Sequence, residues 1–187
     1  TNQTGKKGLK STLQLSLAKG QKLIIDLWDS YNLSLYQINT CEIVQDSRNR
    51  WYACITVKEY PKTTCGTGSV GIDLGLKDLA TCSDGVKLKA PKIYRQYEQK
   101  LGIAKRAKNK KRVKAIHAKI KNIRQNMLHQ FSHKLVKEHA AIFVGNVNAK
   151  ALAQTKLAKS VLDASWTTLR TMLKYKCENA TCAAVLL

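Results

Sequence analysis

The segment from Ser69 to Gly85, with the sequence SVGIDLGLKDLATCSDG, constrains the fold of this chain more than any other stretch. Its first half has the pattern of a short apolar strand that ends in Asp73 and is followed by a tight turn at Gly75. Its second half has the pattern of another strand, closed by Asp84 and Gly85. A carboxylate at the end of a buried strand, next to a glycine that lets a phosphate or metal approach the backbone, commonly holds a divalent ion against a phosphodiester. Asp73 is therefore the candidate catalytic and metal-binding residue of a phosphoryl-transfer site.

The charge of the chain indicates a polyanionic partner. Its 187 residues include 33 Lys and Arg but only 12 Asp and Glu, so that the formal net charge is +21. Such an excess attracts phosphates, and the attraction is screened by salt. No apolar stretch has the length of a membrane span and no signal peptide opens the sequence. We therefore expect a cytoplasmic protein that binds nucleic acid and has neither a membrane partner nor a small-molecule substrate.

The first third of the chain, residues 1–65, has the composition of a β-rich segment. Runs of β-branched and aromatic residues predict strands over residues 22–25, 35–44 and 51–57. The polar residues 46–50 between the last two predict the turn of a hairpin. Residues 61–68, which are rich in Gly and Thr, predict a linker.

The rest of the chain, residues 66–187, alternates between strand and helix patterns. After the strands around Asp73, a helical period extends from about residue 94 to residue 140. An apolar strand follows over 141–145, then an amphipathic helix over 165–177 and a short apolar terminus. This order of strand, strand, helices, strand and helix predicts an α/β domain built on a mixed sheet.

The helical region from about 94 to 140 predicts a basic helical hairpin. Apolar residues step by three and four from Val113 to Leu135, and the pattern lapses around Lys108 to Lys111, where we expect the turn. Between Gln99 and Lys137 there are 13 Lys and Arg and no acidic residue. Solvated lysines are the ordinary alternative, but without carboxylates to pair with, the charges favour a phosphate-binding face. The candidate nucleic-acid-binding residues are Lys105, Arg106, Lys108, Lys110, Lys111, Arg112, Lys114, Lys119, Lys121 and Arg124.

Three aromatic residues have two interpretations. Trp51, Tyr52 and Trp166 could stack on nucleic-acid bases. Aromatic side chains in such settings more often belong to a hydrophobic core, and we expect a core position for all three.

The residues around Asp73 carry a family resemblance. Val70 to Lys77, followed by Ala80 to Gly85, resembles the first RuvC motif of the TnpB (OrfB) proteins of insertion sequences, whose relatives include the type V CRISPR effectors. Further matching segments are Trp28–Tyr31, Arg50–Tyr52, Ala115–Asn122, Ala141–Val147 and Lys156–Trp166. The resemblance implies that residues 66–187 form a partial RNase H-like (RuvC) domain with the basic helical hairpin inserted. It also implies that residues 1–65 form a β-rich wedge-type domain.

The same resemblance implies a transposon-encoded, RNA-guided DNA endonuclease with guide RNA and DNA as partners and Mg²⁺ as cofactor. In the family three carboxylates bind the metal ions, and Asp73 matches the first. At the position of the second, this chain has Gly145 followed by Asn146. The third aspartate and a Cys-x-x-Cys zinc ribbon lie farther downstream in the family, and the six cysteines here form no such pair. We therefore expect a catalytically incomplete member of the family, truncated at both ends.

Three other interpretations stay open at this point. The chain could be a nuclease-dead protein that keeps its RNA- and DNA-binding grooves. Asp73 could simply cap a turn at the end of its strand. The stretch from Gly71 to Gly75 also resembles the first phosphate loop of actin-like and Hsp70-like ATPases, although the sequence has no second glycine-rich loop.

Overall fold

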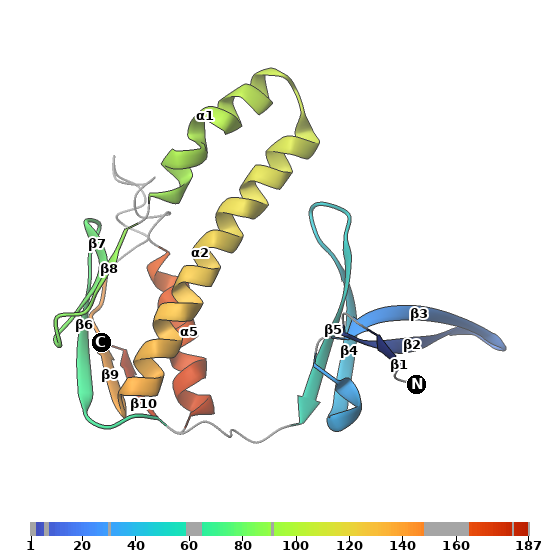
Figure 1. Cartoon of the computed structure of the whole chain (residues 1–187), viewed down its shortest axis with the longest axis horizontal. Coiled ribbons are helices and arrows are strands. Elements are labelled where there is room, and N and C mark those ends of the chain that lie inside the picture. The colour runs from blue at the N-terminus through green and yellow to red at the C-terminus, as the bar shows by residue number, and fades with distance from the viewer. Residues whose placement is uncertain are drawn as a thin grey trace. The chain divides into compact units, whose positions relative to one another are not determined.

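The chain divides into two compact units, residues 1–60 and 61–187, and each unit has its own sheets. The computed structural model, shown in Figure 1, describes residues 3–5, 8–29, 31–58, 65–90, 92–147, 165–180 and 182–186.

The first unit consists of antiparallel strands. Strands β1 (Gln3–Gly5), β2 (Gly8–Ala18) and β3 (Gln21–Asp29) form a sheet in the order β1-β2-β3. A short 3-10 helix, η1 (Leu33–Leu35), leads into the hairpin of β4 (Gln37–Gln45) and β5 (Trp51–Lys58). The predicted β-rich character is confirmed, but β2 and the full length of β3 were not predicted.

A buried carboxylate connects the strands of the first unit to η1. Asp29, at the end of β3, accepts a hydrogen bond from Ser11 Oγ on β2 at 2.7 Å. It also accepts from the backbone N–H groups of Tyr31 at 2.9 Å and Leu33 at 2.8 Å. Asp29 therefore fixes the path of the chain as it leaves the sheet.

The predicted core positions of Trp51 and Tyr52 are wrong. These side chains are 66% and 45% exposed at the start of β5. The physical reason is that β4 and β5 form a two-stranded ribbon, which has no second layer of its own to cover large rings.

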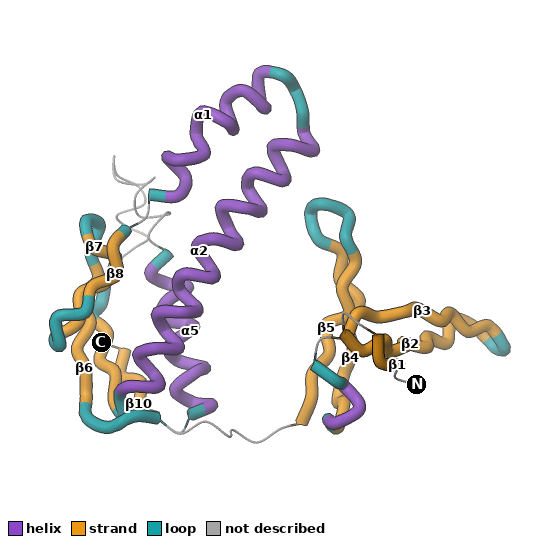
Figure 2. The backbone as a smooth tube through the Cα atoms, in the orientation of Figure 1, coloured by secondary structure: helices purple, strands orange, loops and turns teal. Residues whose placement is uncertain are grey.

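The second unit is built on a mixed five-stranded sheet (Figure 2). Its strands are β6 (Ser69–Leu74), β7 (Asp78–Cys82), β8 (Lys87–Lys89), β9 (Ala141–Val144) and β10 (Ala183–Leu186). They lie in the order β10-β9-β6-β7-β8, with β6, β9 and β10 parallel and β7 antiparallel to both of its neighbours. The predicted mixed sheet is confirmed, with the strand that carries Asp73 at its centre.

Three described helices accompany this sheet: α1 (Ile93–Arg106), α2 (Lys110–Glu138) and α5 (Trp166–Asn179). The C-terminal half of α2 and the whole of α5 lie along one face of the sheet in Figure 1. The main core joins α2 and α5 to the inward side chains of β6, β7 and β9. The helices contribute Leu128 and Leu135 from α2 and Leu169 and Leu173 from α5, which are all at most 1% exposed. Trp166 is 3% exposed in this core, as predicted.

A second, smaller core holds α1 against the N-terminal half of α2. It consists of Ile93, Leu101 and Ala104 from α1 with Ile116 and Ile120 from α2. The predicted helical hairpin is therefore present, with α1 and α2 ending within a few residues of the expected limits. Ile123 belongs to the predicted apolar stripe but is 38% exposed, because it lies between the two cores.

Candidate metal-binding carboxylate and nucleic-acid interface

Asp73 is the penultimate residue of the central strand β6. The burial pattern of β6 alternates, with Val70, Ile72 and Leu74 buried and Asp73 exposed. Because successive side chains of a strand point to opposite faces, the apolar residues face α2 and α5 and the carboxylate faces away from that core. The local pattern thus presents a carboxylate to solvent from a rigid position.

Asp73 lies next to Gly145 at the carboxyl edge of the sheet. The parallel register pairs Ile72 with Val144, and the Gly145 N–H donates to the Ile72 carbonyl at 3.0 Å. Asp73 and Gly145 are therefore the next pair in this register. From this edge the chain leaves β6 toward β7 on one side, and leaves β9 toward α5 and β10 on the other. Open α/β sheets bind ligands at such a switch point, so this edge is the candidate site.

The groups around this edge differ in what they can supply. Asn146 Oδ1 accepts a hydrogen bond from Arg170 Nη1 of α5 at 3.2 Å, which brings a guanidinium to the same edge. The turn after β6 requires Gly75, because a Cβ there would lie 2.9 Å from the Asp78 carbonyl oxygen. A Cβ on Gly145 would lie 3.5 Å from the Ile72 carbonyl, an ordinary contact, so sterics do not demand glycine there.

Asp73 is the candidate ligand for a metal ion at this edge. Within the described ranges, no group of three or more His, Cys, Asp or Glu side chains is placed to hold a metal ion. Mg²⁺ keeps several waters and is often held by one or two carboxylates together with substrate phosphates. Asp73 fits one such ligand. The six cysteines are all free thiols.

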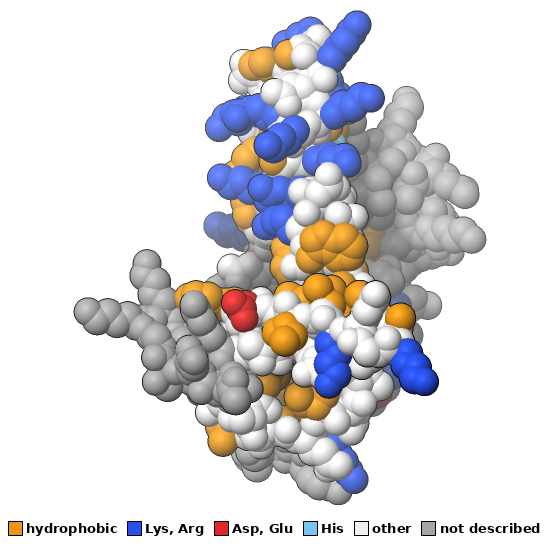
Figure 3. All heavy atoms as spheres, turned by 90° about the vertical axis from the view of Figure 1, so that its right-hand side faces the viewer, with side chains coloured by type: hydrophobic (Ala, Val, Ile, Leu, Met, Phe, Trp, Pro, Cys, Tyr) orange, Lys and Arg blue, Asp and Glu red, His pale blue; other side chains and the backbone are white. Residues whose placement is uncertain are grey.

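The predicted nucleic-acid-binding residues extend along one end of the hairpin. Nine of the ten are exposed, and Arg124 is half-buried. Figure 3 shows Lys and Arg side chains gathered over the end of the molecule formed by α1 and α2. At the tip, Lys108 adopts a positive φ of 50° and the Asn109 side chain accepts from the Arg112 N–H at 2.9 Å, which caps α2. The tip therefore presents its charges from a defined turn.

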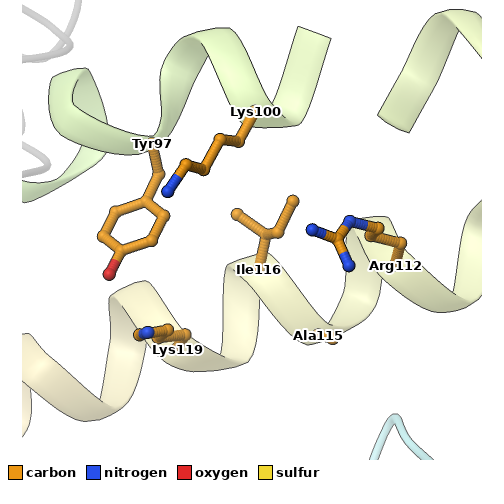
Figure 4. Close-up of a pocket in the computed structure, with 6 residues that line it drawn as sticks. All are labelled: Tyr97, Lys100, Arg112, Ala115, Ile116 and Lys119. Atoms are coloured by element: carbon orange, nitrogen blue, oxygen red, sulfur yellow. The ribbon is translucent and has the colours of Figure 1, made fainter. Parts of the chain in front are cut away.

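A hollow between the two helices of the hairpin was not predicted from the sequence. The hollow has a volume of about 220 Å³ and is lined by Tyr97, Lys100, Arg112, Ala115, Ile116 and Lys119 (Figure 4). The Nζ atoms of Lys100 and Lys119 lie 5.9 and 5.6 Å from the centroid of the Tyr97 ring. The spacing of Tyr97 and Lys100 along one helix was visible in the sequence. The approach of Lys119 depends on how α1 and α2 are paired, which was not.

Fold and surface together describe a basic α/β protein with a carboxylate at the switch point of its sheet. Residues 52–156 match the family model OrfB_IS605, described as “Probable transposase”. The chain belongs to this family, and the resemblance to TnpB (OrfB) proteins is confirmed. None of the helices in the described part of the chain is long and apolar enough to cross a membrane.

Two curated relatives are similar over most of the chain. A “Putative RNA-guided DNA endonuclease” of Streptomyces pristinaespiralis is 32% identical over 181 residues, which cover 88% of this chain and 44% of the relative. A “Putative RNA-guided DNA endonuclease InsQ” of Escherichia coli is 28% identical over 163 residues, which cover 71% of this chain and 40% of the relative. The chain thus spans less than half the length of either relative.

A solved structure is also similar. It is a cryo-EM structure of a Cas12f1–sgRNA–target DNA complex, with a TM-score of 0.41 and 11% identity, covering 90% of this chain and 45% of that one.

Proposed function

We propose that this chain provides the nucleic-acid-binding hairpin and the first metal-binding carboxylate of a transposon-encoded, RNA-guided DNA endonuclease. The observation that carries the proposal is the position of Asp73, exposed at the carboxyl end of the central strand in a member of the OrfB family. The names of the two curated relatives support it. The family assignment favours this function over the actin-like or Hsp70-like ATPase alternative.

The proposal includes an assignment for each segment of the chain. Residues 66–187 are the RNase H-like (RuvC) domain, which is supported by the mixed sheet with Asp73 on its central strand. Residues 1–65 are the wedge-type domain, which is supported by their antiparallel strands. The hairpin of α1 and α2 binds guide RNA and DNA through its exposed lysines and arginines.

Mg²⁺ is the proposed cofactor. When bound in such a site, it activates water and stabilises the leaving oxygen of a phosphodiester. Asp73 would be one of its ligands, while Gly145 has no side chain to offer beside it. We therefore propose that a polypeptide of these 187 residues binds nucleic acid and is catalytically incomplete.

The binding part of this proposal is tested by the salt dependence of affinity. Replacing Lys108, Lys110, Lys111 and Lys114 with Gln should lower the slope of log affinity against log salt by roughly 0.7 to 0.9 for each phosphate that is no longer neutralised, or about 3 in all. A matched control removes four exposed charges outside the hairpin: Lys77, Lys87, Lys89 and Lys174. A slope that is unchanged in the hairpin variant, or lowered equally in the control, would place the nucleic-acid footprint elsewhere.

The catalytic part is tested with the purified chain, Mg²⁺ and a guide RNA transcribed from the end of the transposon that encodes the chain. We expect no DNA cleavage above background, and we expect Asp73→Ala to leave both cleavage and binding unchanged. Guide-dependent cutting that is lost in Asp73→Ala would refute the proposed incompleteness and would mean that other residues complete the metal site. Binding without cutting is also the expectation of the nuclease-dead alternative.

A further inference from the structure

We infer that the hollow between α1 and α2 receives an unpaired nucleotide of a bound strand, with its base against Tyr97 and its phosphate among the surrounding cations. This inference rests on the proposed function, because it assumes that the hairpin binds nucleic acid. It adds a class of ligand, a base with an exposed face, and a residue that recognises it.

The lining of the hollow has two chemical parts. Its floor is apolar and is formed by Tyr97, Ala115 and Ile116. Ile116 is buried, and the other two are partly exposed. Lys100 and Arg112 are exposed and contribute cations, as does Lys119. In Figure 4 the side chains of Tyr97 and Lys100 extend from α1 toward α2. An apolar surface surrounded by cations, with no acidic residue in the lining, matches the ring and the phosphate of a nucleotide.

The size of the hollow limits the ligand. About 220 Å³ is less than the roughly 300–1,000 Å³ of sites that hold drug-sized molecules, so the hollow suits one ring system. A base inside a duplex is stacked on both faces and cannot offer either of them to a tyrosine. Only an unpaired base can enter, which is also how single strands are recognised by aromatic side chains on basic surfaces.

The ring of Tyr97 is held in place, while the cations around it are exposed and can reorient. Tyr97 packs against the small core that contains Ile116 and Ile120, which fixes the ring between the helices. The ammonium groups of Lys100 and Lys119 lie within 6 Å of the ring centroid. Cation–π interactions of exposed lysines are weak, so these groups can turn to a phosphate when a base reaches the ring.

The experiment compares two strands that carry the same phosphate charge. The full chain is titrated with a fluorescently labelled oligonucleotide of about 15 nucleotides and with an abasic oligonucleotide of equal length, each as RNA and as DNA. We expect the natural chain to bind the base-containing strand about 5- to 100-fold more tightly than the abasic one. The RNA and DNA arms identify which strand supplies the base, and a preference in either arm supports the inference. Equal affinities in both arms would overturn it.

Variants assign the preference to one ring. Tyr97→Leu should remove most of the preference and leave both the abasic affinity and the salt slope unchanged, whereas Tyr97→Phe should keep it. Tyr94→Leu is the matched control, because Tyr94 packs against the same small core from the same helix but does not line the hollow. Circular dichroism is used to test whether each variant is folded. A preference that survives Tyr97→Leu, or that Tyr94→Leu removes equally, would overturn the inference. Failure of the proposed function would instead be seen in the salt slope of the variant that replaces four lysines at the tip of the hairpin.

Discussion

Placing a glutamate at position 145 should create a metal site from the two strands that meet at the carboxyl edge of the sheet. Gly145 follows β9 directly beside Asp73, and a Cβ there would make only an ordinary contact of 3.5 Å with the Ile72 carbonyl. Gly145→Glu should therefore fold like the natural chain. It restores a carboxylate at the place where the family resemblance expects one.

The size of the effect follows from the spacing of the strands. Neighbouring strands lie about 4.8 Å apart, so a glutamate at this position can bring its carboxylate within reach of an ion held by Asp73. At about 4 Å in a water-like dielectric, two unit charges attract by about 1 kcal/mol, which becomes about 2 kcal/mol for a divalent ion. Ordering the glutamate side chain costs up to about 1 kcal/mol of this. A net gain of about 1–2 kcal/mol corresponds to roughly 5- to 30-fold tighter binding of the ion.

The assay titrates the chain with Mn²⁺ as a spectroscopic substitute for Mg²⁺ and measures the free ion by electron paramagnetic resonance. Ser69→Glu is the matched control, because Ser69 is exposed at the other end of β6, four residues from Asp73. That separation is about 13 Å, beyond the Debye length of about 10 Å at 0.1 M salt, so the control should leave the affinity unchanged. The double variant Asp73→Asn with Gly145→Glu should lose the gain. If Gly145→Glu binds Mn²⁺ no more tightly than Ser69→Glu does, the two strand ends do not converge on one ion.

Two further predictions concern the stability of the fold. A Cβ on Gly66 would overlap the backbone carbonyl group of Glu138, so Gly66→Ala should destabilise the second unit by about 1–3 kcal/mol in denaturant unfolding. A Cβ on Gly71 would meet only a side chain at 3.9 Å, so an equal loss of stability in Gly71→Ala would contradict the steric explanation. In the hairpin of β4 and β5, the backbone N–H of Arg50 at 3.0 Å and its guanidinium at 2.6 Å hold the pKa of Asp46 at about 2. Because folding lowers this pKa, the ionised Asp46 contributes its full stabilisation of the fold above about pH 4, and this contribution is lost as the pH falls toward 2. An NMR titration of Asp46 should show the lowered pKa. Asp46→Asn should make the unfolding temperature depend less on pH in this acidic range.

Local patterns predicted those parts of the fold in which each element is buried on a regular face. Apolar residues recur every three or four positions along α2 and form short runs in β6 and β9, because these elements bury one side in a core. These patterns could therefore be recognised in the sequence. β8 is only three residues long and carries no such pattern. β2 does carry one, because Leu13, Leu15 and Leu17 alternate with polar residues, and the prediction missed it. Trp51 was misplaced for another reason. Its type favours burial, but whether a ring is covered depends on a second layer that the neighbouring residues do not encode.

Of the two candidate sites, the position of Asp73 could be predicted from the sequence and the hollow at Tyr97 could not. Asp73 could be placed at the carboxyl end of a central strand, beside the strand before Gly145, because both runs were short, apolar and bounded by polar residues. The hollow at Tyr97 could not be predicted, since it requires a cation from α2 to approach a ring on α1. That approach is determined by the packing of the small core, and neither helix alone specifies it.

The two candidate sites lie on one unit but depend on different cores, and this separates the experiments. The residues of α2 that hold the hairpin, Ile116 and Ile120, belong to the small core, whereas Leu128, Phe131 and Leu135 of the same helix belong to the core beneath the sheet. With a rise of 1.5 Å per residue, the 29 residues of α2 make a helix about 43 Å long, along which Ile116 and Leu128 are about 18 Å apart. A substitution on the hairpin surface leaves the packing of the sheet core intact, and one at the carboxyl edge leaves the hairpin intact. A change in nucleic-acid affinity from a hairpin variant and a change in metal affinity from Gly145→Glu can therefore each be attributed to its own site.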